Sequence, residues 1–182
     1  IGFASKATDA TNDAMSISLN GVGKAQVLKA DGVTVQTAKV DPTITMKGVE
    51  DVTLKTTGAE SFVDLAAMDA KTLTISGDAA LDITDIKAGL TTLNASAMTA
   101  GLTIDLDKAA ASEIKTIATG SGDDKITANA QDIIANASVT GGAGNDTLTL
   151  TAGAASTLQL AMSGIETVAM SNITNKVIFS AT

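Results

Sequence analysis

The feature that most constrains the fold of this 182-residue chain is a loose repeat that begins near residue 48. Each unit contains a short alternating strand of Thr, Ile, Leu and Val, a tight turn of small residues, and a second alternating strand. Successive turns are 19, 19, 24 and 22 residues apart when the units are aligned at Gly58, Gly77, Ser96, Gly120 and Gly142. A period near 20 residues is typical of a solenoid, in which each coil stacks on the next and so satisfies its backbone hydrogen bonds.

This repeat predicts an all-β fold, a parallel β-solenoid or β-roll with short strands joined by tight turns. The motif described below predicts that two of these turns bind calcium. The chain has 32 Ala and 16 Gly but only three aromatic residues, which suggests a narrow interior that only small side chains fill. A β-sandwich of short strands is the alternative, since it has turns at similar spacing. Helix is expected at most in residues 108–115 and 131–136, between strands.

The first 47 residues are predicted to form a separate small antiparallel β unit or cap, and residues 48–182 the solenoid. Asp31-Gly32 lies between the alternating segments 27–28 and 33–35, and this dipeptide favours a hairpin because both residues tolerate positive φ. Pro42, the only proline, marks the expected boundary because proline removes a backbone donor and restricts the residue before it.

The residue types that are missing exclude most enzyme chemistry. The chain has no Cys, His, Trp, Tyr or Arg, so catalytic triads, histidine-bound zinc and arginine clamps are absent. A formal net charge of -8 argues against a nucleic-acid partner. The chain has no run of about 18 apolar residues, so no membrane span is predicted. Because the chain opens at Ile1, we expect a piece of a longer protein with any secretion signal outside it.

One motif carries specific chemistry, at residues 141–149. The segment reads Gly-Gly-Ala-Gly-Asn-Asp-Thr-Leu-Thr and matches the nonapeptide G-G-x-G-x-D-x-U-x at every specified position, where U is a large aliphatic residue. The glycines let main-chain carbonyls turn toward one point, and Asp146 adds a carboxylate. These oxygens form half of a calcium site, because calcium takes six to eight oxygen ligands.

A near-copy at residues 119–127 supplies the other half. It keeps every motif position except the first glycine, and Gly120 precedes Gly142 by 22 residues. An uninterrupted array spaces such turns about 18 residues apart, so four extra residues still leave Asp124 and Asp146 in stacked turns. Asp123 and Asn145 are expected to contribute main-chain carbonyls, and turn-capping is the alternative role of Asp124 and Asp146. The predicted metal-binding residues are Thr119, Gly120, Gly122, Asp123, Asp124, Gly141, Gly142, Gly144, Asn145 and Asp146.

At these residues the sequence resembles the repeats-in-toxin (RTX) proteins of bacteria, whose β-rolls bind calcium. The Thr/Ala/Ser-rich coils, and the Gly-x-Glu-x-Val pieces at residues 48–52 and 164–168, resemble the surface-layer (S-layer) proteins of Gram-negative bacteria. That resemblance implies type I secretion, an extracellular location at the cell surface, and assembly with calcium. The chain departs from a toxin β-roll in having two nonapeptides rather than a long array.

We therefore expect a non-enzymatic, calcium-binding structural segment of a secreted surface-layer protein that self-associates into a lattice or oligomer. Any contact with cell-surface polysaccharide would be made through another domain. The alternatives are a spacer or recognition module of an RTX adhesin, and the calcium-binding tail of a secreted protease or lipase. Asp78, Asp82 and Asp85, which lack neighbouring glycine motifs, are expected to be solvated or turn-capping carboxylates rather than a second site.

Overall fold

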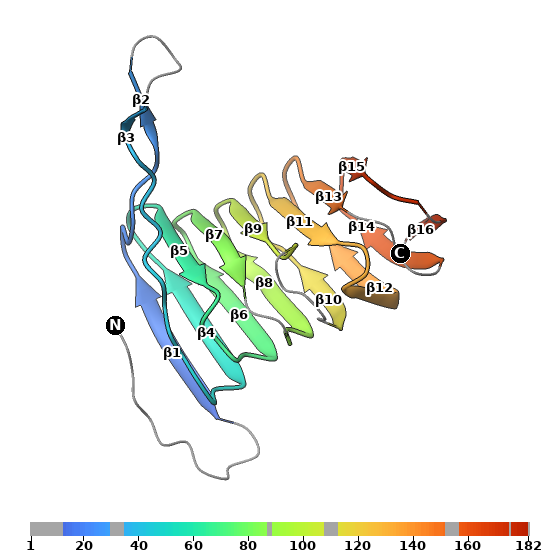
Figure 1. Ribbon diagram of the computed structural model, residues 1–182, viewed down its shortest axis with the longest axis horizontal. Coiled ribbons are helices and arrows are strands. Elements are labelled where there is room, and N and C mark those ends of the chain that lie inside the picture. The colour runs from blue at the N-terminus through green and yellow to red at the C-terminus, as the bar shows by residue number, and fades with distance from the viewer. Residues whose placement is uncertain are drawn as a thin grey trace.

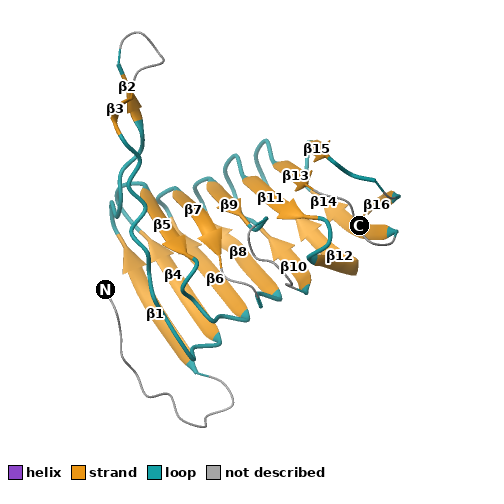
Figure 2. Cartoon of the chain, viewed as in Figure 1, coloured by secondary structure: helices purple, strands orange, loops and turns teal. Residues whose placement is uncertain are grey.

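The computed structural model describes residues 13–29, 35–86, 89–107, 113–151, 157–174 and 176–181. Over these ranges the chain forms two parallel sheets, and from β4 to β16 successive strands of the chain alternate between them as the coils stack along one axis (Figure 1). Strands and loops make up the whole of this part of the chain, with no helix (Figure 2). The predicted all-β solenoid is confirmed, and the parallel, coil-by-coil pairing excludes the β-sandwich.

Each of the six complete coils contributes one strand to each sheet, and the larger sheet has one further strand at each end. The eight-stranded sheet has the order β1 (Ala14–Leu19), β4 (Asp51–Thr56), β6 (Thr72–Gly77), β8 (Thr92–Met98), β10 (Ile114–Ala118), β12 (Ile133–Thr140), β14 (Leu158–Ser163) and β16 (Val177–Ala181). The six-stranded sheet contains β5 (Ser61–Leu65), β7 (Leu81–Ile86), β9 (Leu102–Asp105), β11 (Lys125–Asn129), β13 (Thr147–Thr151) and β15 (Thr167–Ser171).

The core lies between the two sheets and consists mainly of branched aliphatic side chains. One column of the larger sheet stacks Val52, Leu73, Leu93, Ile117 and Val139 in register, each 1% exposed or less. Burying a side chain of this size stabilises the fold by roughly 1.5–3 kcal/mol. The expectation of an interior filled by small residues is wrong, because facing sheets lie about 10 Å apart and leave room for Leu and Ile.

The first strand belongs to the solenoid. β1 pairs in parallel with β4, so the larger sheet continues across the boundary that was expected at residue 47. Antiparallel pairing joins β2 (Val27–Leu28) to β3 (Val35–Thr37), and this arm projects away from the coils (Figure 1). The Asp31-Gly32 turn predicted between these strands lies outside the described residues. After the arm, the chain runs beside β5 and the residues that follow it. Parallel bridges join Thr43 to Asp64 and Met46 to Met68 there.

The helix expected at residues 131–136 is wrong. Residues 130–132 form a turn, in which the N–H of Asp132 donates to the carbonyl of Asn129 at 3.0 Å, and β12 follows. Parallel pairing of β12 with its two neighbours overrides any local helical preference of this segment. Of the other expected helix, residues 108–112 lie outside the described residues, residue 113 is in no regular element, and residues 114–115 are the first two of β10. The described ranges contain no helix that could cross a bilayer.

Candidate metal centre

Two consecutive turns of the solenoid contain the residues predicted to bind metal. They connect β10 to β11 and β12 to β13. Because Ala118 pairs with Thr140 and Lys125 with Thr147, residues 119–124 lie alongside residues 141–146 in the next coil. A bridge between Ser121 and Ala143 joins the two turns. The structure therefore stacks the turns as their 22-residue spacing predicted.

Glycines allow these turns to approach each other closely. Gly142 and Gly144 have φ angles of 102° and 136°, which other residues rarely adopt. A Cβ atom on Gly142 would lie 2.0 Å from the carbonyl oxygen of Gly120, and one on Gly144 would lie 2.2 Å from that of Gly122. Gly142 and Gly144 are thus required both by backbone conformation and by contact with the preceding coil.

The carboxylates of the two turns form a ladder along the solenoid axis. The N–H of Leu102 donates to Oδ1 of Asp124 at 2.7 Å, and the N–H of Asp124 donates to Oδ1 of Asp146 at 2.9 Å. Each carboxylate therefore accepts a backbone hydrogen bond from the coil before it. One oxygen of each side chain thus caps the turn of the preceding coil.

The second oxygen of each carboxylate has no such partner. Oδ2 of Asp124 and Oδ2 of Asp146 are buried and accept no hydrogen bond from the described residues. The two side chains are only 1% and 0% exposed. Burial raises the pKa of the Asp124 carboxyl, against the opposing effects of the Leu102 and Gly120 amides. Burial also raises the pKa of Asp146, and the charges of Asp124 and Glu166 act in the same direction.

The other polar residues of the predicted set link the two turns. The hydroxyl of Thr119 donates to the carbonyl of Gly141 at 2.6 Å. This hydroxyl also lies near the Asp124 carboxylate, but it does not satisfy that group, because its single proton is donated to Gly141. Oδ1 of Asp123 accepts the N–H of Asn145 at 2.9 Å. Only the main-chain carbonyl of Asp123 was predicted to take part in the site, but its side chain also links the two turns.

Glu166 extends the ladder and was not among the predicted ligands. Its Oε2 accepts the N–H of Asp146 at 2.8 Å, because Thr147 pairs with Thr167 and so aligns Asp146 with Glu166. Glu50 repeats this arrangement at the other end of the solenoid, where its Oε2 accepts the N–H of Asp13 at 3.0 Å. The signal for both was the Gly-x-Glu-x-Val spacing, which marks a glutamate that caps the preceding coil.

The ladder does not gather three acidic side chains around a single point. Within the described ranges no group of three or more Asp, Glu, His or Cys residues converges in a geometry that could hold a metal ion. A cation at these turns would therefore have one or two carboxylates among its ligands, with main-chain carbonyls and water supplying the rest.

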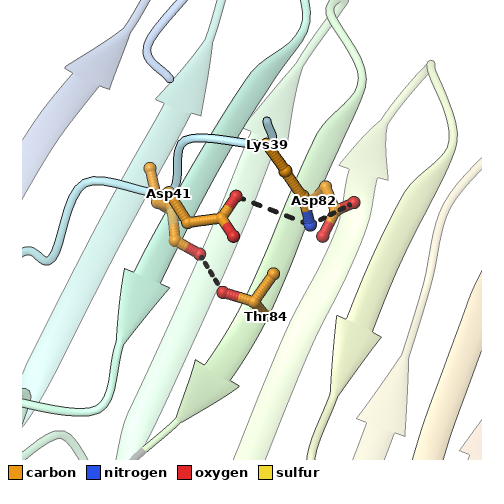
Figure 3. A network of polar contacts seen from close by, with 5 residues as sticks. Lys39, Asp41, Asp82 and Thr84 are labelled. Carbon is orange, nitrogen blue, oxygen red and sulfur yellow. Dashed lines mark hydrogen bonds and ion pairs between the residues drawn. The ribbon is translucent and has the colours of Figure 1, made fainter. Parts of the chain in front are cut away.

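A separate ionic cluster joins the base of the projecting arm to the smaller sheet. Nζ of Lys39 lies 3.0 Å from the Asp82 carboxylate and 3.5 Å from that of Asp41 (Figure 3). The same ammonium group lies 5.5 Å from the centre of the Phe62 ring. The adjacent Thr84 hydroxyl donates to the carbonyl of Val63 at 3.4 Å. Asp82 thus has a lysine partner rather than being simply solvated.

No family model, curated protein or solved structure matches this chain significantly.

Proposed function

We propose that the turns at residues 119–124 and 141–146 bind calcium, and that the ion stabilises the stacking of their two coils. The observation that carries this proposal is the pair of unpartnered carboxylate oxygens, Oδ2 of Asp124 and Oδ2 of Asp146, buried in adjacent turns. A buried carboxylate without a partner is costly, and a divalent cation would offset that cost. Two carboxylates supplemented by carbonyls of the glycine-rich turns match the oxygen ligands that calcium prefers.

We further propose that the chain is a non-enzymatic structural segment of a secreted bacterial surface-layer protein. The resemblance of residues 141–149 and 119–127 to RTX nonapeptides supports calcium-dependent assembly outside the cell. Calcium would link these coils in addition to their backbone pairing, and self-association of the segment would form the lattice.

Thermal unfolding with calcium and with a chelator tests the metal proposal. Binding at about a hundredfold above Kd stabilises the fold by ~2.7 kcal/mol, which corresponds to a Tm increase of roughly 5–10 °C for a chain of this size. The double variant Asp124→Asn/Asp146→Asn keeps both capping oxygens but replaces the unpartnered ones, so its calcium shift is lost. Asp78→Asn, at an exposed turn position, is the matched control and keeps the shift. A shift that survives in the double variant contradicts the proposal.

Electron microscopy of the purified chain tests the structural role. In calcium, a surface-layer segment is expected to give ordered sheets or oligomers that disperse when a chelator is added. Persistent monomers in calcium would instead favour a spacer of an adhesin or the tail of a secreted enzyme.

A further inference from the structure

We infer that a second calcium site lies one coil further along the solenoid, between the turn at residues 141–146 and the tight turn formed by Gly164, Ile165 and Glu166. Its ligands are the Asp146 carboxylate, the Gly164 carbonyl and the Glu166 carboxylate, with water completing the shell. The inference rests on the proposed function because Asp146 would contribute to both sites.

The first observation concerns the space beside Gly141. A Cβ atom on Gly141 would lie 1.7 Å from the carbonyl oxygen of Gly164 and 2.5 Å from Oδ2 of Asp146. This Oδ2 is the buried oxygen that has no donor among the described residues. At these distances the two oxygens fill the space beside the Gly141 Cα rather than leaving it open. A carbonyl oxygen and a carboxylate oxygen that accepts no hydrogen bond from the described residues thus lie close together, and a hard cation bound to both would stabilise this arrangement.

The preceding coil shows what normally stands in this place. The pairing of Ala118 with Thr140 makes Thr119 the counterpart of Gly141, and there the Thr119 hydroxyl donates to the carbonyl of Gly141. The pairing of Thr140 with Ser163 likewise makes Gly164 the counterpart of Gly141 in the following coil. Because the position equivalent to Thr119 is a glycine in the next coil, Gly141, no hydroxyl there faces the Gly164 carbonyl. Among the described residues, the Gly164 carbonyl therefore lacks the side-chain donor that the Gly141 carbonyl has in the preceding pair of coils.

The third ligand comes from the following coil. Glu166 is aligned with Asp146 and accepts the Asp146 N–H through Oε2, and the described residues give Oε1 no hydrogen-bond donor. Its side chain is exposed, which gives water access from one side. Two carboxylates neutralise a divalent ion, and one of them is already buried in the site. Fewer protein ligands and greater solvent access predict weaker binding here than at the site between the two nonapeptide turns.

Calorimetric titration of the 182-residue chain with calcium chloride tests the inference by counting ions. The wild-type chain is expected to bind two. Glu166→Gln keeps the capping oxygen but removes the charge, so it lowers the count to one and leaves the calcium shift in Tm from the first site. Glu50→Gln is the matched control, because Glu50 makes the same backbone contact without a buried Asp beside it, and it still binds two.

The outcomes separate this inference from the proposed function. One ion in the wild-type chain, unchanged in Glu166→Gln, overturns the second site and leaves the first. One ion that Glu166→Gln abolishes and Asp124→Asn leaves intact supports the second site and overturns the first. Two ions reduced to one by either substitution, and to none by Asp146→Asn, support both. The wild-type count decides the question even where a variant unfolds, and a count of zero overturns both sites.

Discussion

The main-chain N–H of Asp124 donates a 2.9 Å hydrogen bond to Oδ1 of Asp146 in the next coil, inside a turn where neither residue is more than 1% exposed. The Asp146 carboxylate therefore has two separable roles. Oδ1 satisfies a buried backbone donor, whereas Oδ2 is buried and accepts no hydrogen bond from the described residues. Substitutions that keep the first oxygen and replace the second can therefore measure each role alone.

In chelator, Asp146→Ala is expected to lower the free energy of unfolding by about 1–3 kcal/mol, because it leaves the buried Asp124 N–H without an acceptor. Asp146→Asn keeps an acceptor and removes a buried charge, so it is expected to be clearly more stable than the alanine variant. Denaturant unfolding of both variants provides the measurement. Equal losses in the two variants would show that the Oδ1 contact contributes little.

The metal-free protein is expected to gain stability as pH falls. Because the folded-state pKa values of Asp124 and Asp146 are raised above 3.8, the folded chain takes up protons before the unfolded chain does. The stabilising contribution of protonation is complete below pH 3.8 and is lost as pH rises through the folded-state pKa values. Saturating calcium should reverse the trend, since protons then compete with the ion.

Thermal unfolding of the wild-type chain and of Asp124→Asn/Asp146→Asn, from neutral pH downward, isolates this effect. In chelator, the Tm of the wild-type chain should rise relative to that of the variant as pH falls. Other carboxylates contribute to both proteins alike. A difference in Tm that is independent of pH would show that the two buried groups do not titrate as described.

The sequence was sufficient to predict the solenoid and the stacking of the two nonapeptide turns. In these turns each glycine is specified by a backbone requirement, as at Gly142, where φ is 102° and the Gly120 carbonyl lies against the Cα. A local motif therefore encodes local geometry, and the spacing of its two copies encodes their register. The pairing of Lys125 with Thr147 follows from that spacing alone.

The register of the other coils was not predictable in the same way. Aligning Gly58 with Gly77, and Gly77 with Ser96, is wrong by two residues, because Gly77 pairs with Thr56 and with Met98. A shift of two residues keeps every inward side chain on the inner face, so the hydrophobic pattern cannot detect it. The lack of a hydrogen-bond donor to the Asp146 Oδ2 atom among the described residues was equally hidden, since it depends on how neighbouring coils pack around the turn.

Lys39→Ala is expected to loosen the base of the projecting arm. The substitution removes the contacts of Nζ with Asp82 and with Asp41, whose Oδ1 is buried and accepts no hydrogen bond from the described residues. Because these side chains are only 21–30% exposed, we expect a loss of about 1 kcal/mol, the upper end for surface ion pairs. Hydrogen exchange should accelerate in β2 and β3. Lys55→Ala, on the exposed face of β4, is the control and should leave this exchange unchanged.

Gly142→Ala and Gly89→Ala together separate backbone strain from close packing. Both glycines have positive φ angles, 102° and 111°, so alanine at either position costs roughly 1–3 kcal/mol through backbone conformation. Only at Gly142 would the new Cβ meet another coil, 2.0 Å from the Gly120 carbonyl, whereas nothing lies within 4 Å of it at Gly89. Forcing the coils apart should add about 1–3 kcal/mol at Gly142. Denaturant unfolding in chelator measures both losses, and equal values would mean that the stacked turns yield without cost.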